Sequence, residues 1–191
     1  MGYNTYFSGK LAFNKPLDKR LNDFLDSFFK TRHFVYSKNK ILEVLNTHGI
    51  SMSKVIPPGF TDCGEHGEFL MDNAFTHLTD RNGNLVTFED CFDDLMDFNL
   101  TPKIIPSLWC DFEITDKGEK ILFVDGKNYG YVKWINFLIE NFFFPAGYIL
   151  NGEVEYQGEN EDDKGKIVCE NNKIDVICYD DDDDDDDDDD T

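Results

Sequence analysis

The sequence lacks any long hydrophobic run. A membrane-spanning helix needs about 20 consecutive apolar residues, and the longest apolar stretch, from Trp134 to Pro145, is interrupted by two asparagines and a glutamate. The N-terminus has neither the basic nor the apolar region of a signal peptide, and Tyr6 stands where a myristoylation motif requires Ser or Thr. We therefore expect a soluble, intracellular protein without a membrane partner.

The sequence also lacks a regular spacing of its cysteines. An odd set of five cysteines, in a chain without an export signal, argues against a disulfide framework. Such residues are better interpreted as small, mostly buried thiols. The five are Cys63, Cys91, Cys110, Cys169 and Cys178.

Basic residues are outnumbered, with 18 Lys and Arg against 39 Asp and Glu and a net charge of −21. The run from Asp180 to Asp190 supplies eleven of these negative charges, and −21 less those eleven leaves −10 for the rest of the chain. Binding to DNA or RNA needs a basic surface that releases counterions from phosphate. We expect no direct nucleic-acid binding.

Catalytic motifs are missing as well. The chain has no Gly-x-Ser-x-Gly elbow, none of its four histidines stands in a motif with Ser or Cys, and no glycine lies in a phosphate-binding loop. An EF-hand beginning at Asp80 fails because Leu85 and Cys91 replace the required Gly and Glu. We expect no cofactor, although a spatial pair such as Cys110 with His66 stays open.

What the chain does contain is enough apolar surface for one core. It has 191 residues, of which 40% are hydrophobic and 18 are Phe. A strand is expected over Thr5 to Phe13, followed by a helix with Pro16 at its first position. Apolar residues then recur at helical spacing. They are Leu17, Leu21, Phe24, Leu25, Phe28 and Phe29.

The C-terminal third predicts the order β-β-α-β-β-β. Trp109 to Ile114 and Lys120 to Val124 flank a turn sequence and indicate a hairpin. Asn128 is expected to cap a helix that ends at Pro145. Tyr148 to Gln157 alternates apolar and polar residues, which is typical of a half-buried strand with one acidic face. Two further strands, Lys166 to Cys169 and Lys173 to Cys178, flank Glu170-Asn171-Asn172.

These patterns predict an α+β fold: a mostly antiparallel sheet with two amphipathic helices packed on one face, plus an irregular inserted middle segment. Residues 1–179 are expected to form a single domain, with 34–106 as the insertion and 180–191 as a disordered poly-Asp tail. Within the insertion, Ile41 to Leu45 fits a helix or a strand, Phe88 to Phe98 fits a helical turn or two, and Asp80 to Gly83 indicates a tight turn.

Several motifs carry a resemblance to a known group of proteins. They are Met1 to Phe7 (Met-Gly-Tyr-x-Thr-Tyr-Phe), Leu108-Trp109-Cys110, the helix Tyr131 to Phe143, Pro145 to Val154 (Pro-x-Gly-Tyr-x-Leu-Asn-Gly-Glu-Val), Gly158-Glu159 and Asp163-Lys164-Gly165. The chain resembles a family of uncharacterised proteins from phages, bacteria and giant, mimivirus-like DNA viruses. The resemblance implies an intact domain in the host cytoplasm or a virion, but no activity or ligand.

Two small sets of residues are candidates for chemistry. Cys63 and His66, with His77 and Cys91 downstream, offer metal-ligand types, although zinc prefers two tight pairs and only the first pair is tight. Glu153 and Glu155 share one side of a strand, so they could bind a divalent metal or act as an acid/base pair. Ordinary loop and solvated-strand roles are the competing interpretations. Aromatics such as Trp109, Tyr129 and Trp134 are interpreted as core rather than as a groove.

Two functions follow from these observations. The favoured hypothesis is a non-enzymatic binding or accessory protein of viral type, whose acidic tail attracts a basic protein partner. A tail that arose by codon-repeat expansion and only aids solubility is the equal alternative for that segment. The second hypothesis is a small hydrolase or transferase that uses Glu153 and Glu155, with or without a divalent metal.

Overall fold

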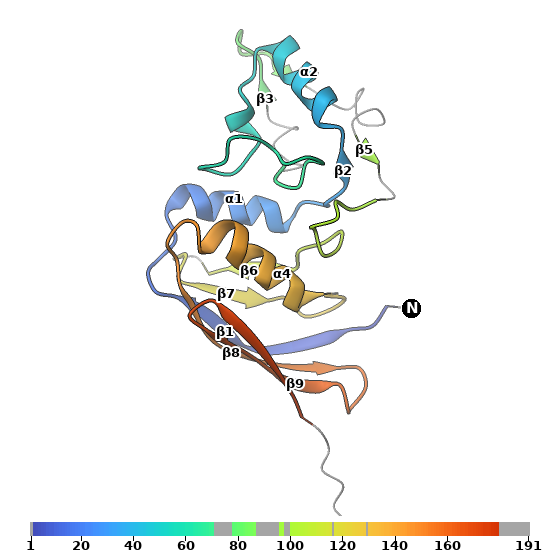
Figure 1. The fold of residues 1–191 in the computed structure, drawn as a ribbon, viewed down its shortest axis with the longest axis vertical. Helices are drawn as coiled ribbons and strands as arrows, with labels where there is room; N and C mark the ends of the chain where they lie inside the picture. The colour runs from blue at the N-terminus through green and yellow to red at the C-terminus, as the bar shows by residue number, and fades with distance from the viewer. Residues whose placement is uncertain are drawn as a thin grey trace, which may run out of the picture.

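The computed structural model describes residues 2–70, 78–86, 96–97, 100–115, 117–128 and 130–179. These residues form an α+β fold around a six-stranded sheet. In Figure 1, helices α1 (Lys19–Phe29) and α4 (Tyr131–Leu138) lie above the sheet, and much of the middle of the chain forms a lobe on the far side of α1.

The sheet is antiparallel between all of its neighbouring strands, as the sequence predicted for most of it. Its order is β10-β9-β8-β1-β7-β6. The strands are β1 (Thr5–Phe13), β6 (Phe112–Ile114), β7 (Lys120–Phe123), β8 (Leu150–Gly158), β9 (Lys164–Glu170) and β10 (Lys173–Cys178). The order of elements after residue 108 is therefore β-β-α-β-β-β, which confirms the prediction for the C-terminal third.

The centre of the sheet is the long pairing of β1 with β8, which extends from Thr5 opposite Gly158 to Phe13 opposite Leu150. Gly152 has a φ of 140°, and a Cβ at this position would lie 2.5 Å from the carbonyl oxygen of Lys10. Only glycine lets the two backbones approach this closely. The glycine of the Asn-Gly-Glu-Val sequence is thus explained by strand packing.

Two hairpins flank this central pair. Asn171 and Asn172 both have positive φ, of 49° and 68°, which is the conformation of a two-residue turn between β9 and β10. The other hairpin pairs β6 with β7. Its first strand begins at Phe112 rather than at Trp109, because the Phe112 N–H bonds back to the Cys110 carbonyl at 3.0 Å and turns the chain there.

Helix α1 begins later than predicted. Pro16 is not its first residue: Asp18 is the N-cap, and its side chain accepts a hydrogen bond from the Leu21 N–H at 3.0 Å. The residue before it, Leu17, donates its N–H to Gly118 O at 2.9 Å instead of entering the helix. The Tyr148 hydroxyl accepts from the Asp18 N–H at 2.9 Å. Contacts with distant segments therefore fix this helix start.

Helix α4 also has a different cap from the one predicted. Gly130, with φ 74°, is the N-cap, whereas the buried Asn128 donates its side-chain amide to Asp111 O at 3.0 Å. The helix continues as a π-helical turn, η4 (Ile139–Phe143), with Phe144 N–H bonded to Ile139 O. This widened turn buries both Phe142 and Phe143.

Both helices contribute to one hydrophobic core together with the buried side of the sheet. Phe28 of α1 is fully buried, and its ring lies 6.2 Å from Trp134 and 6.3 Å from Phe137 of α4. The Phe142 ring is 5.3 Å from Phe28 and 5.4 Å from Phe24. Truncating a phenylalanine in such a position costs about 3–5 kcal/mol.

The middle segment has a hydrophobic cluster of its own. Its members include Ile41 and Leu45 of α2 (Lys38–His48), which settles Ile41 to Leu45 as helix, together with Tyr36 of β2 (Val35–Tyr36) and Val86 of β4 (Leu85–Val86). β2 pairs with β5 (Met96–Asp97), and β4 pairs with β3 (Leu78–Thr79). Phe60 packs against both this cluster and the main core. The division at residues 34 and 106 stays a prediction.

The predicted turn at Asp80 to Gly83 is confirmed, with Gly83 N–H bonded to Asp80 O at 3.0 Å. Apart from Met96 and Asp97, the predicted element Phe88 to Phe98 lies outside the described residues, as do His77, Cys91, Tyr129 and the tail 180–191. No helix in the described part of the chain combines the length and the apolar character that crossing a membrane requires.

Candidate functional site

The carboxylates Glu153 and Glu155 lie on the outward side of β8. Their side chains alternate with the buried Val154 and Tyr156, as the sequence pattern predicted. Glu153 Oε2 accepts a hydrogen bond from Lys166 Nζ at 3.0 Å, and this bond raises the pKa of Lys166. Both partners are accessible to solvent, so the ion pair contributes little to stability.

Cys63 and His66 lie in a loop of the middle segment. Cys63 is buried in the second hydrophobic cluster, and burial raises the pKa of its thiol. Its Sγ contacts the Gly64 carbonyl at 3.5 Å. His66 uses its backbone N–H to bond Glu68 Oε2 at 2.9 Å. In the described ranges, no three His, Cys, Asp or Glu side chains gather where they could hold a metal ion.

The same loop depends on two carboxylates that sequence reasoning missed. Asp62 Oδ1 accepts from the Gly64 N–H at 2.7 Å, and Asp62 Oδ2 lies 3.1 Å from Lys38 Nζ. These two contacts, the backbone bond first, lower the pKa of Asp62. Glu68 is buried, and its Oε2 accepts the His66 N–H. An Asp followed two residues later by Gly is the only sequence signal of this loop.

Burial holds two thiols and one phenol, those of Cys110, Cys169 and Tyr131, in their protonated forms. Cys110 is fully buried in the main core, which raises the pKa of its thiol well above the ordinary value. Burial also raises the pKa of Cys169 to about 11 and that of Tyr131 to about 12. Cys110 belongs to the main core, whereas His66 lies in the loop of the middle segment. At Cys110 and Cys169, the thiolate form that a nucleophile requires would therefore be scarce at neutral pH.

Two tryptophans lie in different environments. Trp134 is fully buried and donates from Nε1 to Ser107 Oγ at 2.7 Å, which confirms its assignment to the core. Trp109 is 48% exposed, so it does not belong to the core. The Arg32 guanidinium lies 4.5 Å from the Phe34 ring and 6.0 Å from the Trp109 ring. This contact covers one part of the Trp109 surface.

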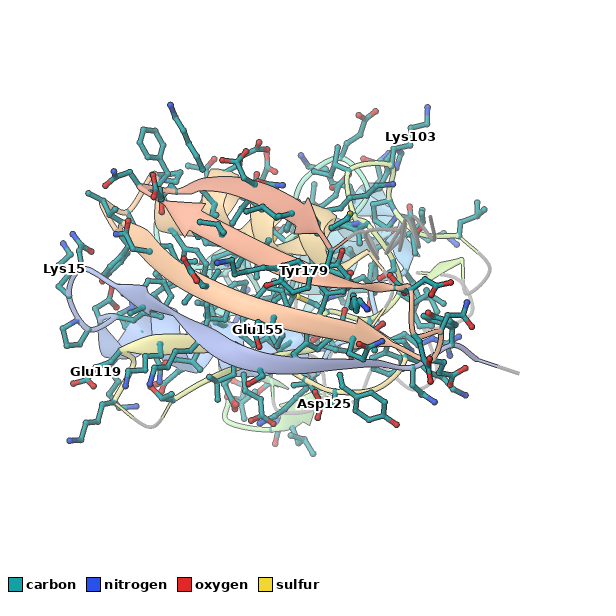
Figure 2. The ribbon with its side chains drawn as sticks, turned by 90° about the horizontal axis from the view of Figure 1, so that it is seen from below. Lys15, Lys103, Glu119, Asp125, Glu155 and Tyr179 are labelled. Carbon is teal, nitrogen blue, oxygen red and sulfur yellow. The ribbon has the colours of Figure 1, made fainter. Side chains whose placement is uncertain are left out.

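The outward side of four adjacent strands, β1, β8, β9 and β10, carries many solvent-exposed side chains, and we call it the open face. Paired residues of antiparallel strands point to the same side of a sheet, so the register defines its rows. The three rows are Tyr6, Gln157, Lys164, Tyr179; Ser8, Glu155, Lys166, Ile177; and Lys10, Glu153, Val168, Asp175. Figure 2 looks onto this side and shows Glu155 and Tyr179 near its centre.

Apolar and charged side chains are interleaved on the open face. Tyr6 is 55% exposed, Ile177 48% and Tyr179 40%. Tyr6 and Tyr179 line a shallow hollow of about 330 Å³ together with Ser8, Glu155, Gln157 and Lys164. The hollow is large enough for one or two side chains of a partner. Sequence reasoning identified only the two glutamates of this surface.

Comparison of the sequence with protein-family models gives no match, and comparisons of the chain with curated proteins and with solved structures give none either.

Proposed function

We propose that the protein is a non-enzymatic accessory protein that binds a basic protein partner through its open face. In this proposal both amphipathic helices pack on one face of the sheet, so the opposite face is left for the partner. The shared core of α1 and α4 supports this arrangement, as does the alternation of buried and exposed residues along β8. The role is proposed to be intracellular, in the host cytoplasm or a virion.

The exposed side chains on the open face carry the proposal. Tyr6 and Tyr179 are large, stiff and partly apolar, and such residues dominate the binding energy of protein interfaces. They border the same hollow, so one partner side chain inserted there would contact both rings. The surrounding Lys and Glu residues provide a polar rim that fixes orientation.

Charge supports a basic partner. The chain carries −21, and the run Asp180 to Asp190 begins directly after Tyr179, at the border of the hollow. A concentration of negative charge at that place raises the rate at which a cationic surface arrives. The open face itself alternates in sign, so it adds specificity rather than long-range attraction.

Site-specific photo-crosslinking tests the proposal. p-Benzoylphenylalanine replaces Tyr6 or Tyr179 in the full chain, and replaces Phe144 as the matched control, because Phe144 is an exposed aromatic residue outside the open face. In lysate of the cells that make the protein, positions 6 and 179 should capture the same basic protein, identified by mass spectrometry. Position 144 should not capture it. Equal capture at all three positions would refute the proposal.

A second arm tests the acidic run. Replacing Asp180 to Asp190 by Asn keeps its length and removes its charge. Association of the captured partner should then slow by about tenfold or more at low salt, with a weaker dependence on ionic strength. An unchanged association rate, measured by stopped flow, would show that the run takes no part.

A further inference from the structure

Strand β10 forms one edge of the six-stranded sheet, with β9 on its other side. Its backbone groups alternate in direction. The Tyr179 N–H bonds to Lys164 O at 3.0 Å, so residues 177, 175 and 173 also direct their backbone groups toward β9. The N–H and C=O groups of Ile174, Val176 and Cys178 therefore point outward from the sheet.

Within the described residues, β10 has neither proline nor a bulge to prevent edge pairing, and its charged side chains are Lys173 at its start and Asp175 on the open face. Native sheets blunt their edges with proline, bulges, inward charges or very short strands. β10 has six residues, contains no proline and pairs with β9 in an unbroken register from Lys173 to Cys178. Val176 is 42% exposed on the side opposite the open face. The other edge, β6, has only three residues.

We propose that β10 pairs antiparallel with β10 of a second copy of this chain, joining two sheets about a twofold axis. The outward direction of residues 174, 176 and 178 fixes the register: Val176 faces Val176 of the partner subunit. Ile174 then lies opposite Cys178 of the partner subunit, and Asp175 lies opposite Ile177 of the partner subunit. On the side of the sheet opposite the open face, each apolar side chain of β10 therefore meets an apolar side chain of the second copy.

A second copy fits this edge because the apolar residues of β10 match one another in this register, and the acidic run favours the antiparallel direction over the parallel one. In the antiparallel register, Tyr179 lies opposite Lys173 of the partner, and the aspartates that begin at residue 180 start beside that lysine. The two runs leave at opposite ends of the joined strands. A parallel pairing would place both runs of eleven aspartates side by side, and like charges at that spacing repel strongly.

The proposal does not depend on the proposed partner of the open face, because the pairing uses only backbone groups and the edge of β10. The pairing of two copies is expected to depend on the salt concentration. Each chain carries −21, so two copies repel at low ionic strength, and screening favours the pair.

Proline at position 176 gives a selective test. Val176 N–H points away from β9, so Val176→Pro removes a bond that the monomer does not use. Sedimentation velocity of the full wild-type chain should show the mass of a dimer as protein concentration rises, more strongly at about 0.5 M salt than at about 0.02 M. Val176→Pro should sediment as a monomer under both conditions. A wild-type chain that stays monomeric throughout, or a dimer that persists in a folded Val176→Pro variant, would overturn the proposal.

Disulfide trapping tests the register independently of the proline variant. Facing residues of a hydrogen-bonded antiparallel pair have Cα atoms about 5.5 Å apart, within the span of a disulfide. In a Cys178→Ser background, Val176→Cys should form a covalent dimer on mild oxidation. Lys173→Cys is the control, because in this register its sulfur lies roughly 20 Å from its counterpart. Equal cross-linking of the two variants, or none in Val176→Cys, would exclude this register.

Discussion

Protonation of His33 should destabilise the folded protein below neutral pH. His33 lies just before the middle segment, with its ring 4.4 Å from Phe28 and 5.1 Å from Trp134. Burial lowers the pKa of its imidazole from 6.5 to about 3, and a hydrogen bond to the Phe28 carbonyl opposes this effect only in part. Nε2 is buried without a hydrogen-bond partner among the described residues. Among the described residues, no charged group contributes to this shift of the His33 pKa.

The sign follows from the two pKa values. Between pH 6.5 and 3 the unfolded chain binds a proton at His33 and the folded chain does not, so the free energy of unfolding falls as the pH falls. The slope is about 1.4 kcal/mol per pH unit. The expected loss is therefore about 2 kcal/mol between pH 6.5 and pH 5. Above pH 7 the contribution of His33 should be constant.

Urea unfolding followed by tryptophan fluorescence measures this effect, because Trp134 is buried beside His33. Wild type and His33→Phe are compared from pH 7.5 to 5, and the difference cancels protonation of the carboxylates common to both. Between pH 7.5 and pH 5, the free energy of unfolding of the wild type should fall by about 2 kcal/mol relative to that of His33→Phe. A wild-type minus His33→Phe difference that does not change with pH would refute the reasoning.

Two further predictions concern the packing of the sheet. Tyr148→Phe removes the hydroxyl that accepts from the Asp18 N–H at 2.9 Å and donates to Asp18 Oδ2 at 3.2 Å. It should cost about 1–2 kcal/mol in chemical denaturation, and an equal stability of the two proteins would contradict this role. Gly152→Ala should cost about 3 kcal/mol or more, because strain at positive φ adds to the clash with Lys10 O. Gly147→Ala has φ 75° and open space around its Cβ, so it should cost only about 1–2 kcal/mol; equal losses would show that the clash is unimportant.

The strands were predictable where two local signals agreed. Alternation along Tyr148 to Gln157 gave both the strand and its outward glutamates, and Glu170-Asn171-Asn172 gave the turn that the positive φ values confirm. The helix starts were not predictable because distant bonds determine them. Leu17 N–H is taken by Gly118 O, and the Asn128 amide by Asp111 O. The local sequence around a helix start does not reveal either of these distant acceptors.

The candidate surface was only partly predictable for a similar reason. Tyr6 and Tyr179 stand at opposite ends of the described chain, and the sheet order alone brings them to one row. A single strand reveals its own outward residues, such as Glu153 and Glu155, but not which strands lie beside it. The second cluster, around α2, also depends on which segments meet, so its core could not be distinguished from loop residues.

Many residues of the motifs that carried the family resemblance are used in packing. Tyr3 donates to Asp163 Oδ2 at 2.7 Å, Glu159 Oε1 accepts from the side-chain amide of its neighbour Asn4, and Asn151 accepts from the Asn171 N–H. Proteins that share these residues are therefore expected to share this fold, whatever they bind. Tyr6, from the opening motif, is different because its ring is mostly exposed on the open face. Packing does not explain an aromatic side chain there, whereas a partner that buries it would.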